Sequence, residues 1–203
     1  MVREAARRGL ILVAGSLVLG DAAARAEASC ADVAIPAELA LGCAATPEGI
    51  AIAPQGGTFA ALSRMTIRPL AKDGSDAGAW SDPPAWLRSQ ITPNLAGLAD
   101  IVSPLADDPD SPFADGQAKQ AVAAFRRALE GLATLPLAAC DEPAPTGADE
   151  WGMRCDFASD GIGLHMALRL VAQDDRRWAI TMRSASEQRL RHFEAIAHSF
   201  QPS

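Results

Sequence analysis

Three neighbouring segments near the C-terminus, 150–158, 162–172 and 177–184, alternate apolar and polar residues with a period of two. This alternation is typical of β-strands that pack one face on a core. The apolar positions are Trp151, Met153, Cys155 and Phe157, then Leu164, Met166, Leu168 and Leu170, then Trp178, Ile180 and Met182. Only short turns separate the segments, whereas a parallel crossover needs a dozen or more residues. The three strands must therefore form an antiparallel meander.

The segments before the meander supply further strands and several helices. We expect strands at 49–53 and 58–70, a short strand within 35–45, and a turn at 72–79, where Asp73-Gly74 is a strong turn signal. Helical patterns follow at 82–91, 92–105 and 115–132. Asp82 precedes two prolines, which suit the first turn of a helix because its N–H groups have no partner there.

A last helix follows the meander. The run Ser184-Ala185-Ser186-Glu187 has the spacing of a capping box, which predicts Ser184 as the N-cap. The expected buried stripe of this helix is Leu190, Phe193, Ala197 and Phe200. Strands, helices, a meander and a final helix together predict an α+β fold, an antiparallel β-sheet with helices packed on it.

The first 26 residues have the three-part layout of a secretory signal peptide. Arg3, Arg7 and Arg8 form the basic start, an uncharged apolar run covers 9–20, and small residues precede a cleavage site after Ala26. The apolar run as a helix reaches only ~18 Å, short of the ~30 Å hydrocarbon core of a membrane. We therefore expect residues 1–26 to be removed and 27–203 to form one domain, periplasmic or secreted, without a stable membrane span.

The four cysteines, Cys30, Cys43, Cys140 and Cys155, all follow the expected cleavage site. Export places them under oxidising conditions, so two disulfides are expected. Three pairings are possible, and we favour Cys30–Cys43 and Cys140–Cys155 because each joins the nearest partner in the sequence. A metal site would need Cys-x-x-Cys spacing or a histidine at ligand spacing to a cysteine, and neither occurs.

Charge and motifs narrow the classes of function. The formal net charge is −7, which argues against nucleic acid as a partner because phosphate binding needs a basic surface. No His-Glu-x-x-His, Gly-x-Ser-x-Gly or glycine-rich phosphate loop occurs. His165, His192 and His198 do not have ligand or catalytic spacing. The sequence therefore assigns no catalytic residue, no metal ligand and no cofactor.

One set of candidate binding residues remains, on the polar sides of the expected strands. The set is Arg64, Arg68, Arg154, His165, Arg169 and Arg183. If these strands are neighbours, their guanidinium groups form a cationic sheet surface suited to a carboxylate or a phosphate. The alternative is that they pair with nearby acids such as Glu150 and Asp156, or are solvated.

The tail from Arg176 to Pro202 resembles the end of PsbP/Mog1-type domains. In that superfamily an aromatic-bearing strand leads into a final helix that closes near I-x-x-S-F, and Ile196, Ser199 and Phe200 stand in those places here. The order of elements is also similar. The resemblance implies an α/β/α sandwich that serves as a small accessory or binding module, usually without catalysis. It carries over no residue-level function, because the matching positions are structural.

The sequence thus predicts an exported, non-catalytic accessory or binding module, with a protein partner in the exported compartment. Two alternatives stay open. One is a periplasmic small-anion binding protein that uses the arginine-rich sheet face. The other is a hydrolase with an unrecognised site, which would need a histidine within hydrogen-bond reach of a serine or an aspartate in a pocket.

Overall fold

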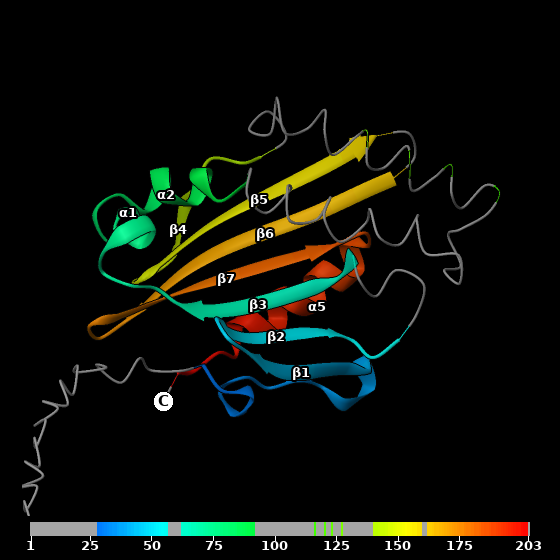
Figure 1. Ribbon diagram of the computed structural model, residues 1–203, viewed down its shortest axis with the longest axis horizontal. Coiled ribbons are helices and arrows are strands. Elements are labelled where there is room, and N and C mark those ends of the chain that lie inside the picture. Colours follow the sequence, from blue (N-terminus) through cyan, green and yellow to red (C-terminus); the bar gives the residue numbers. More distant parts are fainter. Residues whose placement is uncertain are drawn as a thin grey trace, which may run out of the picture.

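The structure is a computed structural model that describes residues 28–56, 62–91, 140–159 and 162–202, with four isolated positions between 116 and 127. Its described part is built on a seven-stranded sheet in the order β1-β2-β3-β7-β6-β5-β4, in which every neighbouring pair is antiparallel (Figure 1). The strands are β1 (Leu41–Thr46), β2 (Gly49–Pro54), β3 (Arg64–Pro69), β4 (Ala144–Gly147), β5 (Glu150–Ser159), β6 (Ile162–Gln173) and β7 (Arg176–Ser184). The expected signal peptide, 1–26, lies outside the described residues.

The expected meander is confirmed as β5, β6 and β7, which pair along most of their length. The turn from β6 to β7 places Asp174 in the left-handed region, with φ 54°, a conformation that aspartate tolerates better than most residues. β7 also pairs with β3, more than a hundred positions earlier in the chain. This long-range pairing joins the N-terminal strands to the meander.

Two short helices, α1 (Gly78–Ser81) and α2 (Pro83–Ser89), pack against one face of the sheet. Asp82 caps α2 as expected, since its carboxylate accepts a hydrogen bond of 3.1 Å from the Ala85 N–H. Trp86 and Leu87 of α2 are buried with the apolar side chains of β5 and β6. Further helices were expected at 92–105, which lies outside the described residues, and at 115–132, of which only the four isolated positions are described.

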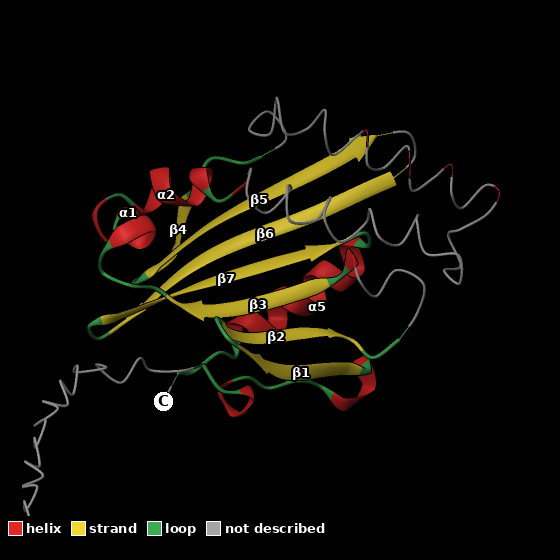
Figure 2. Ribbon diagram, viewed as in Figure 1, coloured by secondary structure: helices red, strands yellow, loops and turns green. Residues whose placement is uncertain are grey.

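The opposite face of the sheet is covered by α5 (Glu187–His198), which lies behind β7 and β3 in Figure 1. Leu190, Phe193, Ile196 and Ala197 are buried there with Trp178, Ile180 and Met182 of β7 and with Met65 and Ile67 of β3. The described helices, which are red in Figure 2, therefore lie on both faces of the sheet, whose strands are yellow.

The expected cap of this helix is wrong by two residues. Ser186, not Ser184, is the N-cap, and its hydroxyl accepts from the Arg189 N–H at 3.4 Å. Ser184 instead ends β7, is fully buried, and its hydroxyl lies 2.9 Å from the hydroxyl of Ser63. The chain needs two residues after β7 to reach the helix, because Ser184 still belongs to the sheet.

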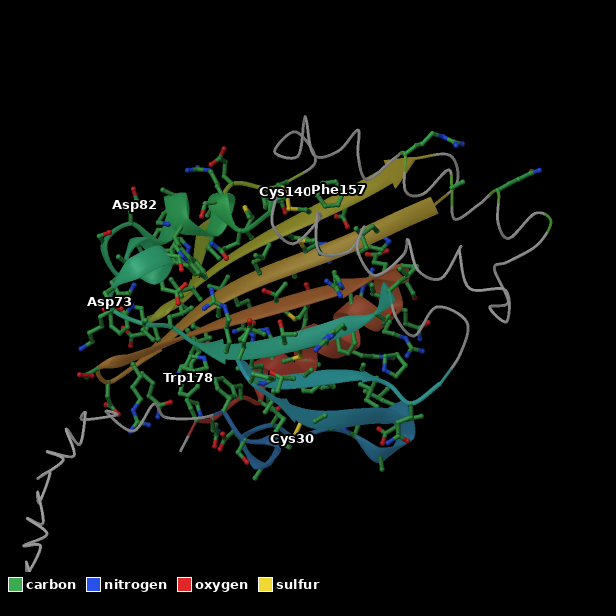
Figure 3. The ribbon with its side chains drawn as sticks, viewed as in Figure 1. Cys30, Asp73, Asp82, Cys140, Phe157 and Trp178 are labelled. Atoms are coloured by element: carbon green, nitrogen blue, oxygen red, sulfur yellow. A yellow bond between two sulfur atoms is a disulfide. The ribbon has the colours of Figure 1, made fainter. Side chains whose placement is uncertain are left out.

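Both favoured disulfides are present. Cys30–Cys43 fastens the N-terminal 3₁₀ turn (Cys30–Asp32) to β1, and Cys140–Cys155 fastens the residues before β4 to β5. Figure 3 labels Cys30 beside β1 and Cys140 beside β5, toward opposite edges of the sheet.

Three further details differ from the expectations. β3 begins at Arg64, and the described residues Leu62 and Ser63 before it are not in the strand. The expected turn at 72–79 contains a 3₁₀ turn (Gly74–Asp76) and the start of α1. The sequence also did not predict β4, an exposed strand at the edge of the sheet. β4 contains Pro145, which has no N–H to donate, and proline is tolerated in an edge strand because one side of that strand has no partner strand.

Candidate functional site

The six candidate binding residues do not share one surface. Arg64, Arg68 and Arg183 lie on the α1/α2 face of the sheet, and Arg154, His165 and Arg169 lie on the α5 face. The reason is the pairing of β6 with β7, which sets Met166 opposite Arg183 and Ala167 opposite Met182. The apolar side of β6 therefore continues as the polar side of β7. The expectation of a single cationic sheet surface is wrong.

On the α5 face, Arg154 is surrounded by carboxylates. Its Nε lies 3.2 Å from Asp156 Oδ2, and its Nη2 and Nη1 lie 3.3 Å and 3.8 Å from the Oε1 atoms of Glu187 and Glu194. Burial alone would lower the pKa of Arg154, but these carboxylates raise it above its ordinary value. Arg154 thus links the sheet to α5 by ion pairs, and its charge is already balanced.

His165 and Asp156 form a second contact on this face. They are cross-strand partners, and His165 Nδ1 lies 2.6 Å from Asp156 Oδ1. Burial would raise the pKa of Asp156, but the hydrogen bonds from His165 and Arg154 and their charges hold it below its ordinary value. His165 is therefore within hydrogen-bond reach of an aspartate, which is one of the arrangements that a hydrolase would need.

Ser184 is the direct cross-strand partner of His165, so aspartate, histidine and serine occupy one row across β5, β6 and β7. The serine hydroxyl, however, is fully buried and bonded to other groups, Ser63 Oγ at 2.9 Å and the Ser186 N–H at 3.0 Å. A nucleophile must reach its substrate, and this hydroxyl has no exposed surface. The row therefore fastens the ends of the strands and does not present a nucleophile.

Two further arginines of the set have acidic partners. Arg169, which is buried, forms an ion pair with Glu150. Arg68 forms a bidentate pair with Asp76, with both N–O distances at 2.9 Å. Burial would raise the pKa of Asp76, yet the hydrogen bonds and charge of Arg68, with the Ala71 N–H, lower it below its ordinary value. The alternative of internal pairing is thus correct for Arg68, Arg154 and Arg169.

Arg64 and Arg183 differ from the other arginines of the set because they have no acidic partner among the described residues. They are direct cross-strand partners on β3 and β7, so their side chains start from neighbouring positions on the same face. Arg183 is 9% exposed and Arg64 is half-buried, and the Nε atom of each is buried without a hydrogen-bond partner. No described carboxylate forms an ion pair with either. Two like charges therefore face each other in a largely buried place.

The pKa of Arg183 also indicates that its positive charge is not compensated. Burial, and then the nearby charge of Arg64, lower the pKa of Arg183 to about 10. A cation has a lowered pKa when its charged form lacks compensation in the folded protein. Arg183 nevertheless remains protonated near neutral pH, since about 10 is far above it. The pair is a permanent site of positive charge inside an acidic protein.

The groups around the arginine pair are hydroxyls on one side and apolar side chains on the other. Thr66 and Thr181 form the next cross-strand pair along β3 and β7, on the same face and half-buried. Met166 and then Cys155 continue the row of the arginines into β6 and β5, and both are fully buried. The threonine hydroxyls add donors next to the guanidinium groups, while Met166 places apolar surface beside Arg183.

Other parts of the described chain offer less chemistry. A shallow pocket at the β6–β7 turn is lined by Gln173, Asp174, Asp175, Arg176, Trp178 and Pro202. Within the described ranges no cluster of histidine, cysteine and acidic side chains could hold a metal ion, and no helix is long and apolar enough to cross a membrane.

The sequence identified Arg64 and Arg183 but could not separate them from the four other residues. It gave no particular weight to Thr66 and Thr181, although both lie on the polar sides of their strands. Distance along the sequence to the nearest acid gives no such signal, because Arg183 has Glu187 four positions on, whereas the paired Arg68 and Arg169 have their nearest acids five positions away. No model of a known protein family matches this chain, and no curated protein matches its sequence.

Proposed function

We propose that this protein is an exported, non-catalytic binding module whose ligand is a small oxyanion held between Arg64 and Arg183. The observation that carries the proposal is the pair itself, two neighbouring guanidinium groups without acidic partners in the described chain. Like charges directly opposite on a sheet destabilise it. A bound anion would relieve this repulsion and stabilise the folded state.

Arginine is the suitable residue for such a site. Its planar guanidinium presents several N–H donors in a fixed arrangement that matches carboxylate and phosphate oxygens. With Thr66 and Thr181 beside them, the two arginines offer both charge and hydroxyl donors from two adjacent strands. A sheet is also a rigid support, so little order would have to be gained on binding.

Export is part of the proposal. It is supported by the signal-peptide layout of residues 1–26 and by two disulfides, which persist mainly in oxidising compartments. We also propose an architecture related to PsbP/Mog1-type domains, supported by the meander that leads into a final helix and by the helices on both faces. An accessory role with a protein partner is compatible with this architecture, but the arginine pair points first to a small ligand.

The test is anion binding by the mature chain, 27–203. We expect phosphate to raise the melting temperature more than chloride does at matched ionic strength. Arg64→Gln and Arg183→Gln should each remove most of this difference. Arg154→Gln is the matched control, because Arg154 lies on the opposite face and is paired with carboxylates.

The control also removes general salt effects, since excluded anions stabilise most proteins by a mechanism that needs no site. An equal response to phosphate in the parent, in Arg64→Gln and in Arg183→Gln would contradict the proposal. Circular dichroism of each variant verifies that it is folded. Export is tested separately, by the intact mass of protein recovered from the periplasm, where a chain that still starts at Met1 would exclude the expected cleavage.

A further inference from the structure

We infer that the oxyanion bound between Arg64 and Arg183 is a tetrahedral dianion, of the class of phosphate monoesters and sulfate, and not a monoanion. The inference rests on the proposed function and adds the charge of the ligand to it. It follows from a count of the charges on this face of the sheet and from the burial of the site.

The charged groups that matter for the ligand are those around the arginine pair on the α1/α2 face of the sheet. Arg68, on the same side of β3, is neutralised by the bidentate contact with Asp76. The neighbour of Arg183 on β6 is Met166, which is uncharged and buried. Arg64 is the one described charge that acts on the pKa of Arg183. The described surroundings of the pair thus hold two uncompensated positive charges.

Burial makes full compensation important. A charge in a low-dielectric site interacts more strongly with its neighbours than in water, and an unbalanced charge there is costly. Among the described groups, a monoanion would leave the site with one net positive charge, whereas a dianion would leave none. The difference acts at Arg183 in particular, because 91% of its surface is removed from water.

The donors present also suit a tetrahedral group. Each guanidinium can donate two parallel hydrogen bonds to a pair of oxygens. Thr66 and Thr181 can donate one more each from the next cross-strand pair. A phosphate monoester offers three terminal oxygens, which are strong acceptors, so both arginines and a hydroxyl can be used at the same time. A carboxylate has only two oxygens to share between the two guanidinium groups.

The experiment uses the mature chain with its disulfides intact and three probes of known charge. Methyl phosphate is a monoanion that becomes a dianion near pH ~6, the second ionisation of a phosphate monoester. Methanesulfonate has a similar shape and stays a monoanion, and sulfate stays a dianion. Affinities are measured by isothermal titration calorimetry from pH 5 to pH 7 at constant ionic strength.

If only the dianion binds, the apparent affinity for methyl phosphate rises about tenfold from pH 5 to pH 7, because the dianionic fraction rises by that factor. Sulfate should bind with nearly constant affinity, which shows that the titration belongs to the ligand and not to the protein. The histidine of the meander, His165, lies on the opposite face of the sheet from the arginine pair and is hydrogen-bonded to Asp156. Methanesulfonate should bind at least tenfold more weakly than methyl phosphate at pH 7.

Different failures have different meanings. Equal affinity for methanesulfonate and methyl phosphate at pH 7 would overturn the inference about charge but leave anion binding intact. The lack of binding by all three probes would overturn the proposed function as well. Arg64→Gln removes one of the two positive charges, that of the less buried arginine. It should therefore abolish the preference for the dianion. A preference unchanged in Arg64→Gln would also contradict the inference.

Discussion

Met166 and Arg183 are direct cross-strand partners on β6 and β7, so a methionine of the core and an arginine point to the same face of the sheet. Met166 is fully buried among the apolar side chains that meet α2, and Arg183 at its side is 9% exposed. The guanidinium group is therefore held against a hydrophobic neighbour on one side and Arg64 on the other. This placement makes the charged form of Arg183 unfavourable for folding, since burial and the charge of Arg64 lower its pKa.

Replacement of Arg183 by methionine should therefore stabilise the ligand-free protein. The folded pKa of Arg183, about 10, is below its unfolded value, so at lower pH the residue is charged in both states and its charge opposes folding throughout. Between about pH 10 and the unfolded value, the unfolded chain binds more protons, and stability should rise with pH for this group. At neutral pH we expect Arg183→Met to be more stable by about 1–3 kcal/mol, measured by urea unfolding in chloride.

The control for this prediction is Arg154→Met on the other face. Arg154 is paired with Asp156, Glu187 and Glu194, so its removal should lower the free energy of unfolding. If Arg183→Met is instead less stable than the parent in chloride, the Arg183 guanidinium has a favourable partner and its charge is compensated in the ligand-free protein.

Loss of the Asp76 carboxylate should destabilise the protein and change its response to acid. Asp76 has a lowered pKa in the folded state, so its contribution to stability is present above its unfolded pKa and is lost as pH falls through the folded value. Asp76→Asn should cost about 2 kcal/mol at neutral pH, because asparagine has no charge and only one acceptor oxygen for the donors of Arg68 and the Ala71 N–H.

Asp175→Asn is the matched control. Asp175 also forms an ion pair of 2.9 Å, with Lys72, but both side chains are largely exposed. Exposed pairs contribute little to stability because water and salt screen them, so this variant should retain nearly the full stability of the parent. If both variants had the same small effect, the Arg68–Asp76 pair would not hold the 3₁₀ turn (Gly74–Asp76) to β3.

Removal of the Cys140–Cys155 disulfide should lower stability by about 3 kcal/mol, the value expected for a closed loop of this length. The two cysteines are 15 positions apart, and Cys155 is fully buried on β5. We expect the double variant Cys140→Ala/Cys155→Ala to unfold at a lower urea concentration than the oxidised parent. Peptide mapping without reductant checks the pairing, and a bridge between Cys43 and Cys155 would contradict it.

The strands could be predicted from the sequence because alternation is a local property. Each segment of the meander shows by itself which of its side chains are apolar, and the order of three nearby antiparallel strands follows from their short turns. β4 was missed since it has no apolar alternation, and the cap at Ser186 was misplaced because both Ser184 and Ser186 can cap a helix.

The arrangement of the candidate site could not be predicted in the same way. Alternation divides each strand into two sides but does not show which side faces which layer of helices. β7 and β3 turn their apolar sides to α5, whereas β6 and β5 turn theirs to α2. Arg64 and Arg183 meet because strands far apart in the sequence are neighbours in the sheet, a relationship that no local pattern contains.

The packing of the final helix should depend on Phe193 and on Phe200, just after its end, and not on its histidines. Phe193 is fully buried in the middle of α5, and the Phe200 ring packs edge-to-face on Trp178 with ring centres 5.4 Å apart. Phe193→Ala should cost about 3–5 kcal/mol, because a large buried ring is lost and a cavity remains. His198→Ala, at an exposed position of the same helix, should change the melting temperature little. Differential scanning calorimetry of both variants compares them directly, and similar small shifts would mean that α5 does not close the core of this face.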